Sequence, residues 1–167
     1  MSLTLILTRH AKSSWDDPAM DDFDRPLNGR GRQSATAIGR WLAAHDLVPG
    51  EVLLSGARRT VETWAGIAAE LNGPAQMRSD PALFHANAQT ILATLKTANA
   101  PIVLLIGHNP GIGEFAARIT TARPTHEKFG QYPTGATTIV QFPETTWADI
   151  GWGAGQALDF VVPRELT

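Results

Sequence analysis

The chain has 167 residues, of which 43% are hydrophobic and 18% charged, and its 14 Lys and Arg against 16 Asp and Glu give a formal net charge of -2. This length and composition predict one globular domain over residues 1–167 with one well-buried core. The charge balance does not favour a nucleic-acid partner, because binding to a phosphate backbone normally appears as a basic excess. The lack of cysteine excludes disulfides, thiol nucleophiles and Cys-based zinc sites.

Short apolar runs alternate with amphipathic segments along most of the chain. Residues 3–8 form a nearly continuous apolar run typical of a buried strand, and segments 51–55 and 101–107 have the same character. Between and after these strands, apolar residues recur at three- and four-residue spacing, which predicts helices that lay one face on a sheet. These helical positions are Ile38, Trp41 and Leu42; Val61, Trp64, Ala65 and Ala68; Ile91, Leu95 and Ala98; and Ile112, Phe115, Ala116 and Ile119. Asn28 stands where an N-cap would precede the first helix.

The last third of the chain predicts a loop and two more strands. Segment 123–134 has little periodicity and three Pro or Gly residues, so we expect a surface loop. Segments 136–142 and 157–162 read as strands with no helix between them, which favours antiparallel pairing. The whole pattern predicts an α/β fold: a three-layer α/β/α sandwich whose mostly parallel sheet has a C-terminal antiparallel extension.

The hydrophobic runs are too short for a membrane protein. No apolar stretch approaches the roughly 20 residues of a membrane-spanning helix. The apolar run at the start has no basic flank and no small-residue cleavage site, so it does not have the form of an export signal. We therefore expect a cytoplasmic protein with no membrane partner.

Basic and imidazole side chains follow three of the predicted strands. The first strand leads into Arg9 and His10, the second into Ser55 and then Arg58 and Arg59, and the third into His108. Ligand sites of open α/β sheets lie beyond the carboxyl ends of the strands, so these residues are expected to converge. Arginine forms charge-assisted bonds to phosphate oxygens, and neutral imidazole is a nucleophile near pH 7. A second imidazole, if protonated, can donate to charge on the transferring group.

Each of these residues also has a structural interpretation when taken alone. His108 is compatible with a hydrogen-bonded turn, and Arg58 and Arg59 with the solvated start of a helix. The shared position at strand ends is what favours a site. His45, His85 and His126 do not have that position and are expected to be structural or exposed.

Several motifs resemble those of the histidine phosphatase superfamily, and in particular its small SixA-type phosphohistidine phosphatases. Leu-Thr-Arg-His-Ala-Lys at 7–12 is similar to the Arg-His signature, and 22–27 with Gly31 is similar to the Asp-x-x-Arg-Pro-Leu stretch. Segment 55–63 fits Ser-x-x-x-Arg-x-x-x-Thr, segment 107–111 fits the second-histidine motif, and 133–136 also resembles the family. The resemblance implies a phosphoglycerate mutase-like fold.

The resemblance also implies roles for individual residues. His10 would be the phosphorylated nucleophile, Arg9, Arg59 and His108 would form the phosphoryl pocket, and Arg25 would be a further phosphate contact. Counting from Ser55 places the motif arginine at 59, whereas Arg58 points about 100° away on the same helix. Larger members use a glutamate as proton donor. Region 78–88 has only Asp80 and no glutamate, which leaves Asp22 as the expected acid.

The function predicted from the sequence is phosphoryl hydrolysis through His10, with no metal and no cofactor. The missing glutamate proton donor and the few residues left to form a lid favour N-phosphorylated protein, such as phosphohistidine, as the substrate. The alternatives are a phosphatase of small phosphate esters, a mutase, and a module that binds phosphorylated partners without turnover. A metallohydrolase using His10, His108 and an aspartate is disfavoured by the neighbouring arginines. The oligomeric state is not determined by the sequence.

Overall fold

The structure, a computed structural model, describes residues 2–167. These residues form a six-stranded sheet in the order β3-β2-β4-β1-β5-β6. The strands are β1 (Leu3–Arg9), β2 (Glu51–Leu54), β3 (Gln76–Ser79), β4 (Ile102–Gly107), β5 (Thr137–Phe142) and β6 (Gln156–Val161). The first four are mutually parallel, and β5 runs antiparallel to both β1 and β6. The predicted sheet with its antiparallel C-terminal extension is confirmed.

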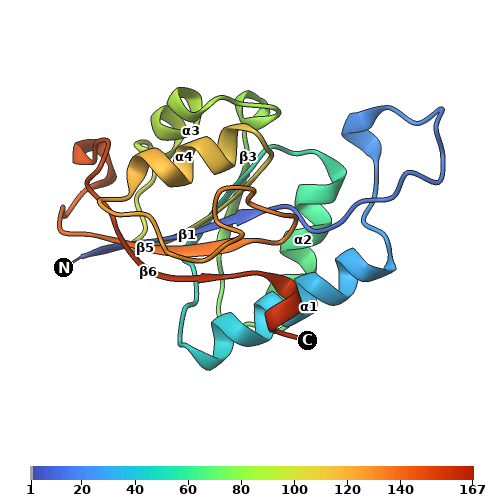
Figure 1. Cartoon of the computed structure of the whole chain (residues 1–167), viewed down its shortest axis with the longest axis horizontal. Helices are drawn as coiled ribbons and strands as arrows, with labels where there is room; N and C mark the ends of the chain where they lie inside the picture. Colours follow the sequence, from blue (N-terminus) through green and yellow to red (C-terminus); the bar gives the residue numbers. More distant parts are fainter. Residues whose placement is uncertain (1) are drawn as a thin grey trace.

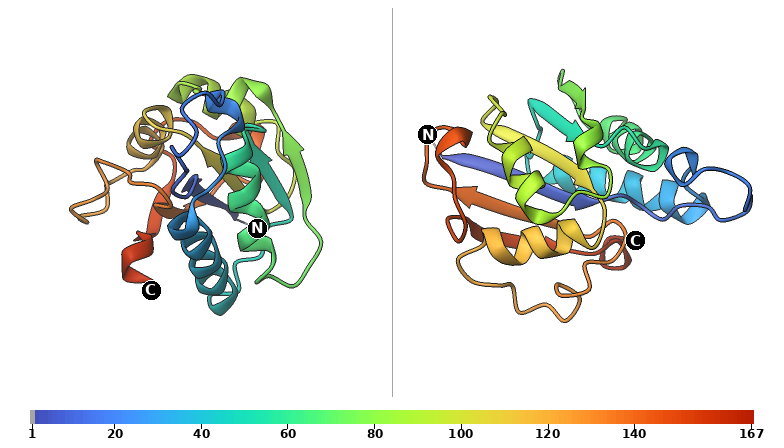
Figure 2. Two further views of the ribbon diagram at one scale, coloured as in Figure 1. Left: turned by 90° about the vertical axis from the view of Figure 1, so that its right-hand side faces the viewer. Right: turned by 90° about the horizontal axis from the view of Figure 1, so that it is seen from above.

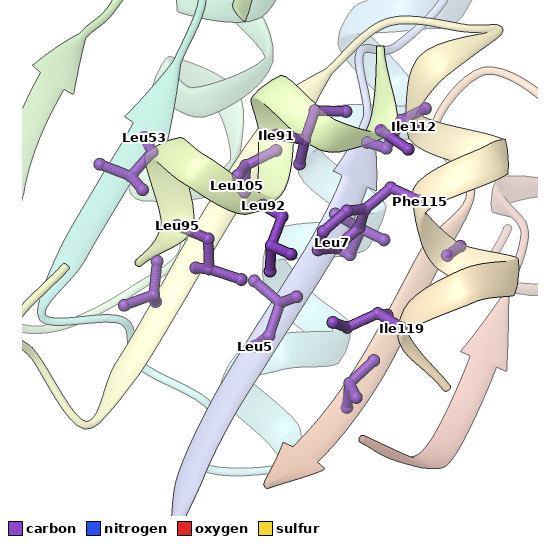
Figure 3. Packing of buried hydrophobic residues seen from close by; sticks show 14 of the residues in the cluster. Leu5, Leu7, Leu53, Ile91, Leu92, Leu95, Leu105, Ile112, Phe115 and Ile119 are labelled. Carbon is purple, nitrogen blue, oxygen red and sulfur yellow. The ribbon is translucent and has the colours of Figure 1, made fainter. Parts of the chain in front are cut away.

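Helices cover both faces of this sheet. They are α1 (Gly29–Ala44), α2 (Arg58–Ala68), α3 (Ala88–Leu95) and α4 (Gly111–Ile119). In Figure 1, α3 and α4 lie on one side of the sheet and α1 lies on the other. The central strands are buried on both sides, so alternate residues enter different clusters: Leu5 and Leu7 pack with α3 and α4 (Figure 3), whereas Ile6 packs with Ile38 and Ile67. This burial explains why the strands read as continuous apolar runs.

The start of α1 fits closely against the segment that follows β1. Asn28 accepts a hydrogen bond from the Gly31 amide at 2.8 Å, so the predicted N-cap is confirmed. A Cβ at Gly31 would overlap the carbonyl group of Lys12. Glycine therefore allows α1 to begin directly beside the carboxyl end of β1.

The structure differs from the sequence prediction in three places. Strand β3 was not predicted, because all four of its residues are exposed and Gln76–Ser79 has no apolar pattern. The helix predicted around Ile91 ends at Leu95, so Ala98 lies beyond it. Segment 123–134 is a loop as expected, but Tyr132 is fully buried and its hydroxyl donates to the Leu7 carbonyl at 2.7 Å. That loop is therefore anchored in the core rather than lying on the surface.

The segment from residue 11 to residue 28 extends outward beyond the carboxyl end of β1 (Figure 2). It contains the short 3-10 helix η1 (Asp22–Asp24) and returns to the body at α1. No helix formed by residues 2–167 has both the length and the hydrophobicity that spanning a bilayer requires.

Candidate active site

Strand register brings the two predicted histidines together. Arg9 on β1 pairs with Gly107 on β4, so His10 and His108 each follow a matched position. The His10 amide continues the pairing by donating to the Gly107 carbonyl at 3.1 Å. The two imidazole rings have centroids 5.2 Å apart, and both side chains are buried. The carboxyl edge of the sheet therefore presents an imidazole pair.

The hydrogen bonding of His10 leaves one ring nitrogen available for attack. Its Nδ1 lies 2.7 Å from the Ala11 carbonyl oxygen, which can only accept, so Nδ1 carries the proton. The lone pair is then on Nε2. Burial, with smaller contributions from the positive charges of Arg59, Arg9 and Arg25, lowers the pKa of His10 to about 4. Near pH 7 this side chain is a neutral nucleophile of fixed tautomer.

His108 is held between α2 and the end of β2. Its Nε2 lies 2.8 Å from Ser55 Oγ, and its Nδ1 lies 3.3 Å from a terminal nitrogen of Arg59. Arginine can only donate, so Nδ1 accepts and Nε2 carries the proton toward Ser55. Burial first, then the neighbouring His10 and Arg59, lower the pKa of His108 to about 3. His108 is therefore neutral in this structure, so it does not meet the condition of protonation under which it would donate to the transferring group.

Helix α2 delivers Arg59 to the pocket and directs Arg58 away from it. Arg59 is 2% exposed, whereas Arg58 forms an exposed ion pair with Glu62 at 2.8 Å. The Thr63 hydroxyl donates to the Arg59 carbonyl at 2.7 Å and accepts from the Ala11 amide at 2.9 Å. This threonine links the turn after the nucleophile to the helix, which is the structural reason for the spacing of the motif.

Asp22 connects the loop after β1 to the rest of the pocket. Its carboxylate accepts from Arg25 Nε at 2.9 Å and from Arg59 at 3.0 Å, and it lies 3.0 Å from His85 Nε2. Partial burial acts to raise the pKa of Asp22, but the hydrogen bonds from Arg25 and His85 and the charge of Arg59 lower it to about 2. An ionised carboxylate has no proton to donate near pH 7, which does not favour the predicted role of Asp22 as general acid, and that role stays a prediction. Its contacts make it a positioning residue for the two arginines.

His85 was expected to be structural or exposed; it is exposed, and it also lines the pocket. Its ring centroid lies 5.4 Å from that of His108, and its backbone has a φ of 55°, which is unusual for a residue other than glycine. The next residue, Ala86, packs so closely on α4 that a Cβ at Gly111 would overlap its carbonyl. The available signal was the position of His85 six residues beyond the end of β3, in the connection that follows that strand. That signal was hidden because β3 was not recognised.

Comparison with known proteins identifies the family. Residues 5–87 match the model of the histidine phosphatase superfamily (branch 1). An uncharacterized chloroplastic protein of Arabidopsis thaliana is 32% identical over 133 residues, 73% of this chain, and the chain spans 61% of that protein's length. The chain belongs to the histidine phosphatase superfamily.

Solved structures of this superfamily include small members that match almost the whole chain. A putative phosphohistidine phosphatase SixA from Nakamurella multipartitia has a TM-score of 0.82 and 28% identity, with 98% of this chain and 97% of that chain covered. A putative SixA from Agrobacterium tumefaciens has a TM-score of 0.77 and 25% identity, with 96% and 98% covered. The expected phosphoglycerate mutase-like fold is confirmed, and the likeness is to SixA-type members of the superfamily.

The pocket of this superfamily member is rich in positive charge. It encloses about 570 Å³ and is lined by Arg9, Arg25, Arg59 and both strand-end histidines. Arg25 donates to Ser13 Oγ at 2.6 Å, and its guanidinium carbon lies 3.5 Å from the centre of the exposed Trp15 ring. Within residues 2–167, no three His, Asp or Glu side chains converge as a metal site would require.

Two of the pocket arginines have unused hydrogen-bonding capacity. The buried Nε atoms of Arg9 and Arg59 have no acceptor in the described part of the chain. Burial lowers the pKa of both guanidinium groups, with the like charge of Arg59 also acting on Arg9. A tetrahedral oxyanion next to His10 would supply acceptors for such donors.

Proposed function

We propose that this protein is a phosphatase that transfers a phosphoryl group to Nε2 of His10 and then hydrolyses it, with N-phosphorylated protein side chains such as phosphohistidine as substrate. One observation carries the proposal. A neutral imidazole of fixed tautomer lies in a pocket lined by three arginines. General binding sites for anions do not require such a nucleophile.

The first chemical step follows from this geometry. The Nε2 lone pair of His10 attacks phosphorus, a new N–P bond forms, and the bond from phosphorus to the leaving group breaks. The arginines are positioned to bind the phosphoryl oxygens, whose negative charge they neutralise without a metal ion. A bound phosphoryl dianion also raises the pKa of the nearby His108, and a proton on Nδ1 would replace the hydrogen bond from Arg59 with one to the phosphoryl group.

The second step returns the enzyme to its starting state. A water oxygen attacks the phosphorus of phospho-His10, the N–P bond breaks, and inorganic phosphate leaves. Asp22 is ionised and stands beside His85. A carboxylate at this position can accept a hydrogen bond from the attacking water and orient it, and the proton that the water loses ends on the phosphate product.

The substrate class follows from the missing acid and from the structural likeness. An alkyl ester needs a proton donor, because alkoxide is a poor leaving group. A phosphoimidazole protonated on its other nitrogen leaves as neutral imidazole and has no such need. The low pKa of Asp22 argues against this residue as an acid for alkyl esters, and the N. multipartitia relative is described as a putative phosphohistidine phosphatase. Both observations favour an N-phosphorylated substrate over phosphate esters.

The decisive experiment traps the covalent intermediate. The enzyme is mixed with a phosphohistidine peptide labelled on phosphorus and quenched at alkaline pH. It should carry label that is stable to base and labile to acid, and His10→Ala should carry none. His45→Ala is the matched control, since that exposed side chain contacts only the Trp41 carbonyl and ring. Label retained in His10→Ala would overturn the assignment of the nucleophile. Equal kcat/KM for phosphoserine and phosphohistidine peptides would overturn the substrate class alone.

A further inference from the structure

A second hollow adjoins the catalytic pocket and is lined by cations. It encloses about 240 Å³, and the charged residues that line it are Lys12, Arg30, Lys128 and Arg164. Lys12, Pro133 and Thr134 line both this basic hollow and the catalytic pocket, so the two are adjacent. Of the described residues that line it, none is acidic.

The four cations come from separate elements that the fold brings together. Lys12 follows the nucleophile by two residues, Arg30 lies in the first turn of α1, and Arg164 lies in η4 (Pro163–Glu165). Lys128 lies in the anchored loop. In Figure 1 the C-terminal end of the chain lies beside α1, which is how Arg164 reaches this region. The cluster is therefore a product of tertiary structure rather than of a basic run in the sequence.

The charge of this hollow differs from that of the rest of the surface. Arg40, Arg58 and Arg118 each form an ion pair with a glutamate on the protein surface. The four cations of the hollow form no such pair within residues 2–167. The nearby Glu165 is engaged elsewhere, by His126 and by the Val162 amide. In a chain with a net charge of -2, this concentration of free positive charge attracts anions to one side of the pocket mouth.

We propose that the basic hollow binds acidic side chains next to the phosphorylated residue of a protein substrate. The proposal rests on the proposed function. Lys12, Arg30 and Arg164 are exposed and long, and they are not fixed by hydrogen bonds to the protein as Arg25 and Arg59 are. Exposed cations spread around an open hollow suit carboxylates along a peptide, whereas a second phosphate group is better held by fixed, buried arginines. The phosphoryl group would occupy the catalytic pocket and the flanking acidic residues the hollow.

The test compares two phosphohistidine peptides that differ only in flanking Asp and Glu against Asn and Gln. The wild-type enzyme should hydrolyse the acidic peptide with roughly 10-fold higher kcat/KM, and the ratio should fall as salt is raised. Arg30→Glu with Arg164→Glu should reduce the ratio to about one or below. The variant should still hydrolyse an activated aryl phosphate at close to the wild-type rate.

The matched control is Lys96→Glu with Arg123→Glu. It makes the same change in net charge at two exposed cations outside the hollow, and the ratio should stay at the wild-type value. Equal kcat/KM of the wild-type enzyme for the two peptides would overturn the proposal. An equal fall of the ratio in the control variant would also overturn it. Preference for a small bisphosphorylated molecule over the acidic peptide would also overturn it.

The two proposals fail in different ways. If the wild-type enzyme hydrolyses an aryl phosphate but not a phosphohistidine peptide, the proposed substrate is wrong. In that case the preference of the basic hollow for acidic flanking residues is measured by inhibition. Phosphoserine peptides with the same two flanking sequences are used as inhibitors of aryl phosphate hydrolysis. A tenfold difference between their inhibition constants supports the basic hollow, and equal constants overturn it.

Discussion

The two sides of the catalytic pocket are built in different ways. On one side, the strand-borne side, His10 and His108 follow strands whose register is set by backbone pairing and by burial on both faces of the sheet. On the other, loop-borne side, Asp22 lies in the short 3-10 helix η1, and Arg25 and His85 lie in loops. These three residues are joined by side-chain hydrogen bonds to Asp22. The first side is rigid because moving it would break the core, whereas the second depends on a few charged contacts.

Arg59 on α2 contacts both sides of the pocket, through His108 and Asp22, whereas its neighbour Arg58 lies outside the pocket, so this pair should show the largest difference. Arg59→Ala removes a buried guanidinium from the pocket, and we expect kcat/KM for an aryl phosphate to fall by about 100-fold, or about 3 kcal/mol. Arg58→Ala loses only an exposed pair with Glu62 and should stay within about threefold of wild type. The reverse ranking, measured by steady-state kinetics, would show that Arg58 contributes to the reaction.

The strand-borne nucleophile predicts a particular pH dependence. Because the pKa of His10 is lowered to about 4, its reactive neutral form persists from neutral pH down to about pH 5. Below pH 4, kcat/KM corrected for substrate ionisation should fall about tenfold per pH unit as His10 gains a proton. The sign follows from the need for the deprotonated form. A decline that already begins near pH 6.5 would show that the nucleophile is not desolvated as described.

The loop-borne side should give the smaller effects, and these should not depend on the leaving group. Asp22→Asn weakens the contacts with Arg25 and Arg59, so we expect roughly a 10-fold fall in kcat/KM on aryl and alkyl phosphates alike. His85→Gln keeps a donor near Asp22 and serves as the comparison. A loss confined to alkyl phosphates in Asp22→Asn would show that Asp22 is a general acid after all.

Much of the strand-borne side could be predicted from the sequence. Buried parallel strands appear as apolar runs, and their carboxyl ends mark where polar residues meet, so the positions of Arg9, His10 and His108 followed directly. Counting along one helix likewise distinguished Arg59 from Arg58, because helical periodicity is a local property. Both predictions depend on local sequence patterns, namely apolar runs for strands and helical periodicity for the arginines.

Tertiary structure decided the remainder. The protonation state of Asp22 depends on Arg25, His85 and Arg59, which reach it from three separate segments. His85 entered the pocket because an exposed edge strand, without any apolar pattern, set the path of the chain before it. The basic hollow likewise gathers Lys12 and Arg164 from opposite ends of the chain. Sequence patterns report local periodicity and burial, whereas charge environments arise from contacts between distant segments, and only the folded chain determines those contacts.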